Sequence, residues 1–312
     1  MDSKRTKLAS AVFISGLLIL SACVNATPQP LPAAPGTASA LPTGAPLPVS
    51  SPTSNPTSTA APLILNPQVF TLADNLPGPD DLLLAADGSI LLSDVSDGTI
   101  RQYTPDGRIS VVLSGLNEPE GMAFLPDGSL IIAEQGKNRL TRRDPSSGNL
   151  TPFLSLQNHT NNLGVDGILW TGSELIVPDS PNGKILSVTP DGLTVRQIAA
   201  GFARPTGAWM ESTGDLLIAD ENGDAVFRVS ADGTFRKVAD FSVPDDVIQD
   251  GSGNIFVTTL GDDAIHLLKA QTGEDVILVS GLKDPQGIIF DAGGNLIVAD
   301  PGNHRLLKVV IH

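Results

Sequence analysis

One motif of about 40 residues occurs six times in the chain, and this repeat restricts the fold more than any other feature. The repeats open with the triplets Pro79-Asp80-Asp81, Pro119-Glu120-Gly121, Val165-Asp166-Gly167, Pro205-Thr206-Gly207, Pro244-Asp245-Asp246 and Pro285-Gln286-Gly287. The central residues of successive triplets lie 40, 46, 40, 39 and 41 residues apart. Each triplet leads into an apolar run, a glycine turn and a second apolar run, a pattern that predicts β-hairpins rather than helices.

Two further short runs follow in most repeats. Thr99 to Tyr103 and Lys184 to Val188 have the pattern of third strands, and Ile109 to Leu113 and Asp275 to Val279 have that of fourth strands. Four strands in a period of about 40 residues are typical of a β-propeller blade. We therefore predict an all-β fold, a six-bladed β-propeller.

The sixth repeat ends after its third strand. The segment 68–72, QVFTL, precedes the first triplet and has the pattern of a missing fourth strand. We expect this N-terminal strand to complete the last blade and close the ring, which removes an exposed sheet edge. A solenoid is the competing architecture, but it would need a capping repeat rather than complementary fragments at its two ends.

The first 66 residues differ from the rest. Residues 1–23 combine Lys4, Arg5 and Lys7 with an apolar run and a Leu-Ser-Ala-Cys ending at Cys23, the only cysteine. This pattern predicts a signal peptide, and its ending resembles the lipobox of bacterial lipoproteins, in which the cysteine becomes lipidated. The alternative is an ordinary signal peptide. Residues 24–66 lack charge and are rich in Pro, Ala, Thr and Ser, which predicts a disordered tether before a propeller at 67–312.

The predicted location is therefore the bacterial cell envelope, extracytoplasmic and lipid-anchored to the membrane through Cys23. The chain has 34 acidic and 19 basic residues. Removing the one acidic and three basic residues before the apolar run leaves 33 against 16, a net charge of −17. This charge argues against nucleic acid as a partner, because phosphate binding needs a basic face. We expect a monomer that binds a small molecule or a protein at its channel face.

The central residues of the six triplets open the first strands, which line the channel of a propeller. They are Asp80, Glu120, Asp166, Thr206, Asp245 and Gln286, hereafter the ring residues. Four are acids, and two unit charges ~6 Å apart repel by about 3 kcal/mol at an effective dielectric constant of ~20. A bound cation, a shared proton or channel water must offset this repulsion. An all-oxygen donor set favours a divalent metal such as Ca²⁺ over zinc. The alternative is that the acids are solvated or bond backbone amides.

The sixth repeat, from Pro285-Gln286-Gly287 through Asp300 to Asn303-His304-Arg305, resembles the NHL repeat, which builds six-bladed propellers. The triplet Pro244-Asp245-Asp246 is also similar to the Pro-Asp-Gly segments of the senescence marker protein/gluconolactonase family. That resemblance implies a metal-dependent lactone hydrolase. It places Asp80 at the position of a first-blade glutamate ligand, Asp245 at a fifth-blade aspartate, and Thr206 where the family has asparagine.

The resemblance thus implies a metal site formed by Asp80, Asp166, Thr206 and Asp245, with Ca²⁺ as the expected ion. The metal would polarise a lactone carbonyl, with Asp245 as ligand and general base and Glu120 as a second catalytic carboxylate. Thr206 departs from the family pattern. A non-catalytic scaffold that binds a protein or glycan, as many NHL proteins do, is therefore the alternative function.

Two other sets of residues are predicted to be structural. Each second strand ends in a polar residue, 13 or 14 positions after the ring residue. These are Asp94, Glu134, Asp179, Asp220, Thr259 and Asp300. An Asp before a loop commonly bonds the backbone two residues further on. Trp170 and Trp209 lie in first strands and are expected in the core.

Overall fold

A computed structural model describes residue 63 and residues 65–157 and 164–312. The predicted signal peptide with Cys23, and nearly all of the predicted tether, lie outside these residues. None of the helices in the described ranges has the length and apolar character of a membrane-spanning segment.

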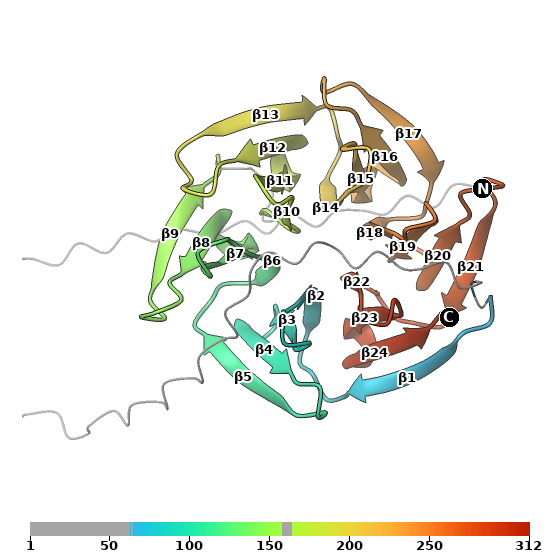
Figure 1. The fold of residues 1–312 in the computed structure, drawn as a ribbon, viewed down its shortest axis with the longest axis horizontal. Helices are drawn as coiled ribbons and strands as arrows, with labels where there is room; N and C mark the ends of the chain where they lie inside the picture. Colours follow the sequence, from blue (N-terminus) through green and yellow to red (C-terminus); the bar gives the residue numbers. More distant parts are fainter. Residues whose placement is uncertain (1–62, 64, 158–163) are drawn as a thin grey trace, which may run out of the picture. The chain divides into compact units, whose positions relative to one another are not determined.

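The described chain folds into six four-stranded antiparallel sheets. Figure 1 shows the sheets arranged as blades around a common centre, with the first strand of each repeat innermost. The predicted all-β, six-bladed β-propeller is therefore confirmed.

The strands of the first three blades follow the repeats in order. Blade 1 contains β2 (Pro79–Leu84), β3 (Ile90–Asp94), β4 (Thr99–Tyr103) and β5 (Ile109–Ser114). Blade 2 contains β6 (Pro119–Phe124), β7 (Leu130–Glu134), β8 (Arg139–Arg143) and β9 (Leu150–Ser155). Blade 3 contains β10 (Leu169–Trp170), β11 (Leu175–Asp179), β12 (Lys184–Val188) and β13 (Val195–Ala200).

The remaining blades repeat this order. Blade 4 contains β14 (Pro205–Met210), β15 (Leu216–Asp220), β16 (Ala225–Val229) and β17 (Phe235–Asp240). Blade 5 contains β18 (Pro244–Gln249), β19 (Ile255–Thr259), β20 (Ala264–Leu268) and β21 (Asp275–Ser280). Blade 6 contains β22 (Ile288–Phe290), β23 (Leu296–Asp300) and β24 (Arg305–Val310). Short 3₁₀ helices follow four second strands: η1 (Gln135–Lys137), η2 (Ser180–Asn182), η3 (Glu221–Gly223) and η4 (Pro301–Asn303).

The outermost strand of blade 6 is β1 (Gln68–Ala73), from the beginning of the described region. It pairs antiparallel with β24, so that Gln68 lies opposite Val310 and Thr71 opposite Leu307. Leu72 and Ala73 also pack against the apolar cluster between blades 6 and 1. β1 lies next to β24 at the outside of the ring (Figure 1).

The hydrophobic core lies between neighbouring blades. The second strands, β3, β7, β11, β15, β19 and β23, are buried along their whole length. Apolar clusters join each blade to the next, as between Leu91 of blade 1 and Met122 of blade 2. A strand buried on both faces reads as a continuous apolar run, and this is how the second strands appear in the sequence.

Three of the acids that end second strands, Glu134, Asp220 and Asp300, anchor the loops that open their own blades. Glu134 accepts a hydrogen bond from Asn117 N at 2.9 Å, and Asp300 accepts one from Lys283 N at 2.7 Å. Asp220 accepts two, from Ala203 N at 2.9 Å and Arg204 N at 2.6 Å. The expected structural role is observed, but the partners lie 16 or 17 residues earlier in the chain rather than two residues later. These bonds fix the loops that lead into the ring residues.

Candidate functional site

The ring residues owe their position to a break in the β-ladder. Asp80, Glu120, Thr206 and Asp245 are second residues of β2, β6, β14 and β18, directly after a proline. In blade 1 the ladder is irregular between Pro79 and Leu82, and the same irregularity occurs in the other three blades. Such bulges change the direction of side chains. The ring residues of blades 3 and 6 precede β10 and β22, which begin later.

Five ring residues line one cavity of about 220 Å³, which we call the acidic mouth. The lining comprises Asp80, Glu120, Gln135, Asp166, Arg204, Glu221, Asp245, Leu260 and Gln286. The sixth ring residue, Thr206, is buried beside them, and its hydroxyl donates a hydrogen bond to the backbone oxygen of Asp245 at 2.6 Å. The four predicted ring acids therefore converge.

Asp80 and Glu120 form a hydrogen-bonded carboxyl pair. Burial, opposed by the hydrogen bond from Glu120, raises the pKa of Asp80 to about 6. Burial, followed by the charges of Asp80 and Asp166, raises the pKa of Glu120 well above its usual range. The hydrogen bond between the two carboxyl groups lowers the pKa of Asp80 and raises that of Glu120. The repulsion expected from the sequence is thus partly relieved by a shared proton.

Asp245 is the third buried carboxyl group of the acidic mouth whose pKa is raised. Burial is the main cause, followed by the negative charges of Asp166 and Asp80. With its amide nitrogen facing blade 5, Gln286 donates to both carboxylate oxygens of Asp245, at 2.9 and 3.0 Å. The acidic mouth therefore holds three carboxyl groups that retain protons more readily than exposed acids do.

Three residues that sequence reasoning missed complete the site: Arg204, Gln135 and Glu221. Arg204 Nη2 lies 2.7 Å from Asp166 Oδ2, and Arg204 Nη1 contacts Glu221. Gln135 Nε2 donates to Glu120 Oε1 at 2.8 Å and to Asp166 Oδ2 at 3.4 Å. Arg204 could have been found from the sequence, because it is the one basic residue that directly precedes an opening triplet.

The donors at the acidic mouth are carboxylate, amide and hydroxyl oxygens, the atoms that Ca²⁺ and Mg²⁺ prefer. Asp166 shares only Oδ2 with Arg204 and Gln135, so Oδ1 remains as a possible donor atom. Among the described residues, however, no group of three or more His, Cys, Asp or Glu side chains is arranged to hold a metal ion. The donor chemistry fits a hard cation, while the carboxylates would have to move to coordinate one.

Comparison with known proteins places this site in context. The family model described as SMP-30/Gluconolactonase/LRE-like region matches residues 81–310, which include five of the six ring residues. No curated protein matches the chain.

Solved structures share the propeller. A gluconolactonase from Xanthomonas campestris aligns with a TM-score of 0.68 and 16% identity, over 88% of this chain and 99% of that one. A calcium-binding regucalcin from Agrobacterium tumefaciens aligns with a TM-score of 0.63 and 16% identity, over 80% and 94%. A streptogramin B lyase aligns with a TM-score of 0.62 and 16% identity, over 80% and 99%. At these identities the likeness establishes the fold alone.

Proposed function

The chain belongs to the SMP-30/gluconolactonase/LRE-like family, and on that basis we propose that it hydrolyses lactones at the acidic mouth with a bound divalent cation. The observation that carries the proposal is the convergence of Asp80, Glu120 and Asp245, three buried carboxyl groups with raised pKa values, in one cavity. Strongly perturbed carboxyl groups in a cavity are typical of catalytic and metal sites.

Asp80, Asp166, Thr206 and Asp245 are the residues that would hold the cation, through their side-chain oxygens. Ca²⁺ is the expected ion, since its coordination tolerates irregular oxygen donor sets better than that of Mg²⁺. When bound, a divalent cation supplies Lewis acidity that polarises an ester carbonyl. It would also relieve the repulsion among the ring acids, which are held together by the propeller.

The chain's own carboxyl groups would move the protons of hydrolysis. Asp245 accepts a proton from the attacking water as the new carbon–oxygen bond forms. Glu120, whose pKa is raised and which is hydrogen-bonded to Asp80, donates a proton to the oxygen of the lactone ring as the ester bond breaks. The product is the open hydroxy acid, and one water molecule is consumed. A carboxyl group with a raised pKa is suited to act as such an acid near neutral pH.

Calcium titration followed by thermal unfolding tests the metal site. In protein treated with chelator, Ca²⁺ should raise the melting temperature of the wild type, because a ligand that binds only the native state stabilises it. Asp245→Asn should lose most of this shift, while Asp87→Asn, which removes an exposed loop carboxylate outside the acidic mouth, should retain it. A screen of sugar and aliphatic lactones then tests hydrolysis. If neither Ca²⁺ binding nor hydrolysis is seen, the proposal is wrong.

A non-catalytic binding module is the second candidate function. It is favoured by the ion pairs of Arg204 with Asp166 and Glu221, because they neutralise part of the ring without a metal. Under this alternative the wild type and Asp245→Asn would respond equally little to Ca²⁺. A partner should then be found by cross-linking at the acidic mouth.

We also propose that Cys23 carries a lipid anchor and that the protein lies outside the cytoplasm, in the cell envelope. The sequence pattern of residues 1–23 supports it. Expression in a bacterium with labelled fatty acid tests it. The wild type should carry label and fractionate with membranes, and Cys23→Ser should carry none. An unlabelled wild type would contradict the anchor.

A further inference from the structure

The channel holds a second cavity, of about 360 Å³, at the end opposite the acidic mouth. Its lining includes the hairpin loops between first and second strands, at Ala85, Gly88 and Ala292, whereas Gln135, Glu221 and Leu260 at the acidic mouth follow the second strands. Apolar side chains from all six blades dominate this cavity, which we call the apolar funnel. They include Leu82, Met122, Trp170, Trp209, Ile248 and Phe290. The volume falls within the roughly 300–1,000 Å³ typical of small-molecule sites.

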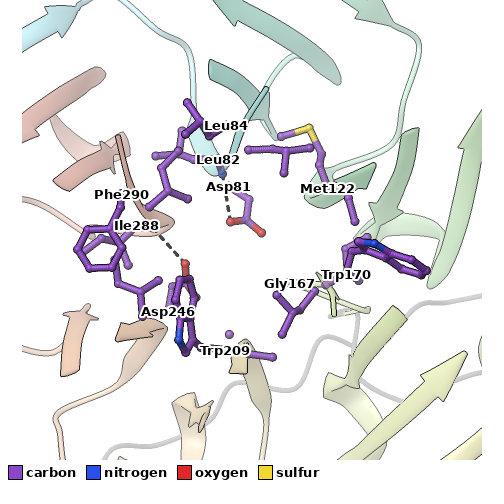
Figure 2. A pocket seen from close by; sticks show the side chains of 18 of the residues that line it. Asp81, Leu82, Leu84, Met122, Gly167, Trp170, Trp209, Asp246, Ile288 and Phe290 are labelled. Atoms are coloured by element: carbon purple, nitrogen blue, oxygen red, sulfur yellow. Dashed lines mark hydrogen bonds between the residues drawn. The ribbon is translucent and has the colours of Figure 1, made fainter. Parts of the chain in front are cut away.

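Two carboxylates enter this apolar surface, from Asp81 and Asp246 (Figure 2). Both stand at the third position of an opening triplet, where the other four repeats have glycine. Glycines in neighbouring blades make room for them. A Cβ atom on Gly287 would lie 2.8 Å from Asp81 Oδ1, and one on Gly207 would lie 2.5 Å from Asp246 Oδ1. The two acids are therefore accommodated by the packing of the blades.

The two carboxylates approach the same short stretch of blade 6. Asp246 Oδ2 accepts a hydrogen bond from Ile288 N at 3.1 Å, next to Gly287, which adjoins Asp81. Asp246 Oδ1 also accepts one from Val247 N at 2.8 Å, while Asp81 accepts one from Leu82 N at 3.1 Å. A carboxylate offers about four acceptor sites. Each carboxylate therefore has acceptor capacity that these bonds do not use.

In the part of the funnel that the described residues form, no positive charge compensates these acids. Its described lining contains Asp81, Asp166, Asp245 and Asp246 and no Lys, Arg or His. Arg204 lines only the acidic mouth, where it pairs with Asp166 and Glu221. A partly desolvated carboxylate in an apolar wall is costly unless it is paired. The funnel thus combines an apolar body with four carboxyl groups at its inner end, and burial raises the pKa of Asp246 to about 7 and that of Asp81 well above its usual range.

We propose that the apolar funnel binds a small organic amine, with its ammonium group at Asp81 and Asp246 and its apolar body against Trp170 and Trp209. Ammonium groups form charge-assisted hydrogen bonds to carboxylates, and indole rings attract cations as well as apolar groups. This site opens at the other end of the channel from the proposed lactone site, and Asp166 and Asp245 line both cavities.

Intrinsic fluorescence provides a direct test, because Trp170 and Trp209 are the only tryptophans of the chain and both line the funnel. The full chain is titrated at neutral pH with phenylbutylamine and with phenylbutanol, its neutral counterpart of similar shape. The amine should change the fluorescence saturably and bind at least about tenfold more tightly than the alcohol, since a charge-assisted hydrogen bond contributes that much.

The variants Asp81→Asn and Asp246→Asn keep the side-chain shape and remove the charge. Each should weaken amine binding by about tenfold and change alcohol binding by less than about twofold. Retained alcohol binding shows that the funnel is still folded. Asp87→Asn, in the exposed loop after β2, should bind both probes like the wild type. Equal affinity for amine and alcohol, or wild-type amine affinity in both variants, would overturn the proposal.

Discussion

Arg204 Nη2 and Asp166 Oδ2 lie 2.7 Å apart and join the loop before blade 4 to the ring position of blade 3. Both side chains are buried, and the second arm of the guanidinium contacts Glu221. One guanidinium group thus pairs with two carboxylates. The pair holds neighbouring blades together at the point where the ring acids repel one another.

Arg204→Gln should lower the free energy of unfolding by about 3 kcal/mol, because it leaves the buried carboxylate of Asp166 and the partly buried one of Glu221 without the guanidinium. Adding Asp166→Asn should restore at least about 1 kcal/mol of that loss, since the partners are coupled. Urea unfolding of the single and double variants measures both values. Arg108→Gln is the matched control: its pair with Asp106 is 82% and 55% exposed and should contribute less than about 1 kcal/mol. Similar losses for both arginines would contradict this account.

Glu134 should make the protein sensitive to acid. Burial alone would raise its pKa, but hydrogen bonds from Lys137, Thr141, Arg139 and Asn117 N outweigh burial and lower it to about 2, from 4.5. Because the folded-state pKa is depressed, the stabilisation is fully present above pH 4.5 and is lost as the pH falls toward 2.

Glu134→Gln should therefore cost on the order of 3 kcal/mol at pH 6 and less than half of that near pH 3. Chemical unfolding of wild type and variant at the two pH values gives the difference. Glu174→Gln, at an exposed pair with Arg196, serves as control and should show little loss at either pH. A loss for Glu134→Gln that does not depend on pH would mean that the side chain acts by packing rather than by charge.

The repeat sufficed to predict the propeller because every blade needs the same apolar second strand and the same glycine turns. It also predicted that the ring acids converge, since a residue that opens each first strand must face the channel. It could not show how their charges are relieved. Arg204 comes from a loop and Gln135 from a 3₁₀ helix, and their contacts depend on how neighbouring blades pack.

The apolar funnel was missed because its chemistry depends on exceptions to the repeat. Asp81 and Asp246 replace glycine in two of six triplets, and this departure was the available signal. Trp170 and Trp209, expected in the core, are only partly buried. They pack against the inter-blade clusters and also line the funnel. Periodicity identifies the strand that carries a residue, but a bulge decides the end of the channel that its side chain reaches.

Deleting β1 should destabilise the whole propeller, because the edge of β24 then becomes exposed. A chain that begins after residue 73 should unfold at a lower temperature than a chain that begins at residue 63, which keeps β1. It should also aggregate in gel filtration. Adding a peptide of residues 66–76 should partly restore the melting temperature of the shorter chain. Equal stability of the two chains would show that the pairing of β1 with β24 is dispensable.

Asp245→Asn should stabilise the metal-free protein at pH 8. Burial and the charges of Asp166 and Asp80 raise the pKa of Asp245, so ionising this carboxyl group is less favourable in the native state than in the unfolded state. The contribution of Asp245 to the free energy of unfolding therefore falls as the pH rises from 3.8 toward the raised pKa. The Asn variant has no ionisable group at this position and does not show this fall. Urea unfolding in chelator should give a higher midpoint for the variant at pH 8 and a smaller difference near pH 4. A variant that is less stable than the wild type at pH 8 would contradict the claim that the Asp245 carboxylate destabilises the native state.

Gly207→Ala should be among the most harmful small substitutions, since the blades meet too closely for a methyl group. Its Cβ would lie 2.5 Å from Asp246 Oδ1, 2.7 Å from the Cα of Asp246 and 2.8 Å from Asp245 O. Two of these atoms are backbone and cannot move without separating blades 4 and 5, so we expect a loss of about 3 kcal/mol. Gly293→Ala is the control, because its nearest neighbours are side-chain atoms at 3.3 Å in an exposed loop. Thermal unfolding compares the two variants. If both melt at the same temperature, the close approach of blade 5 to Gly207 does not restrict the size of the residue at position 207.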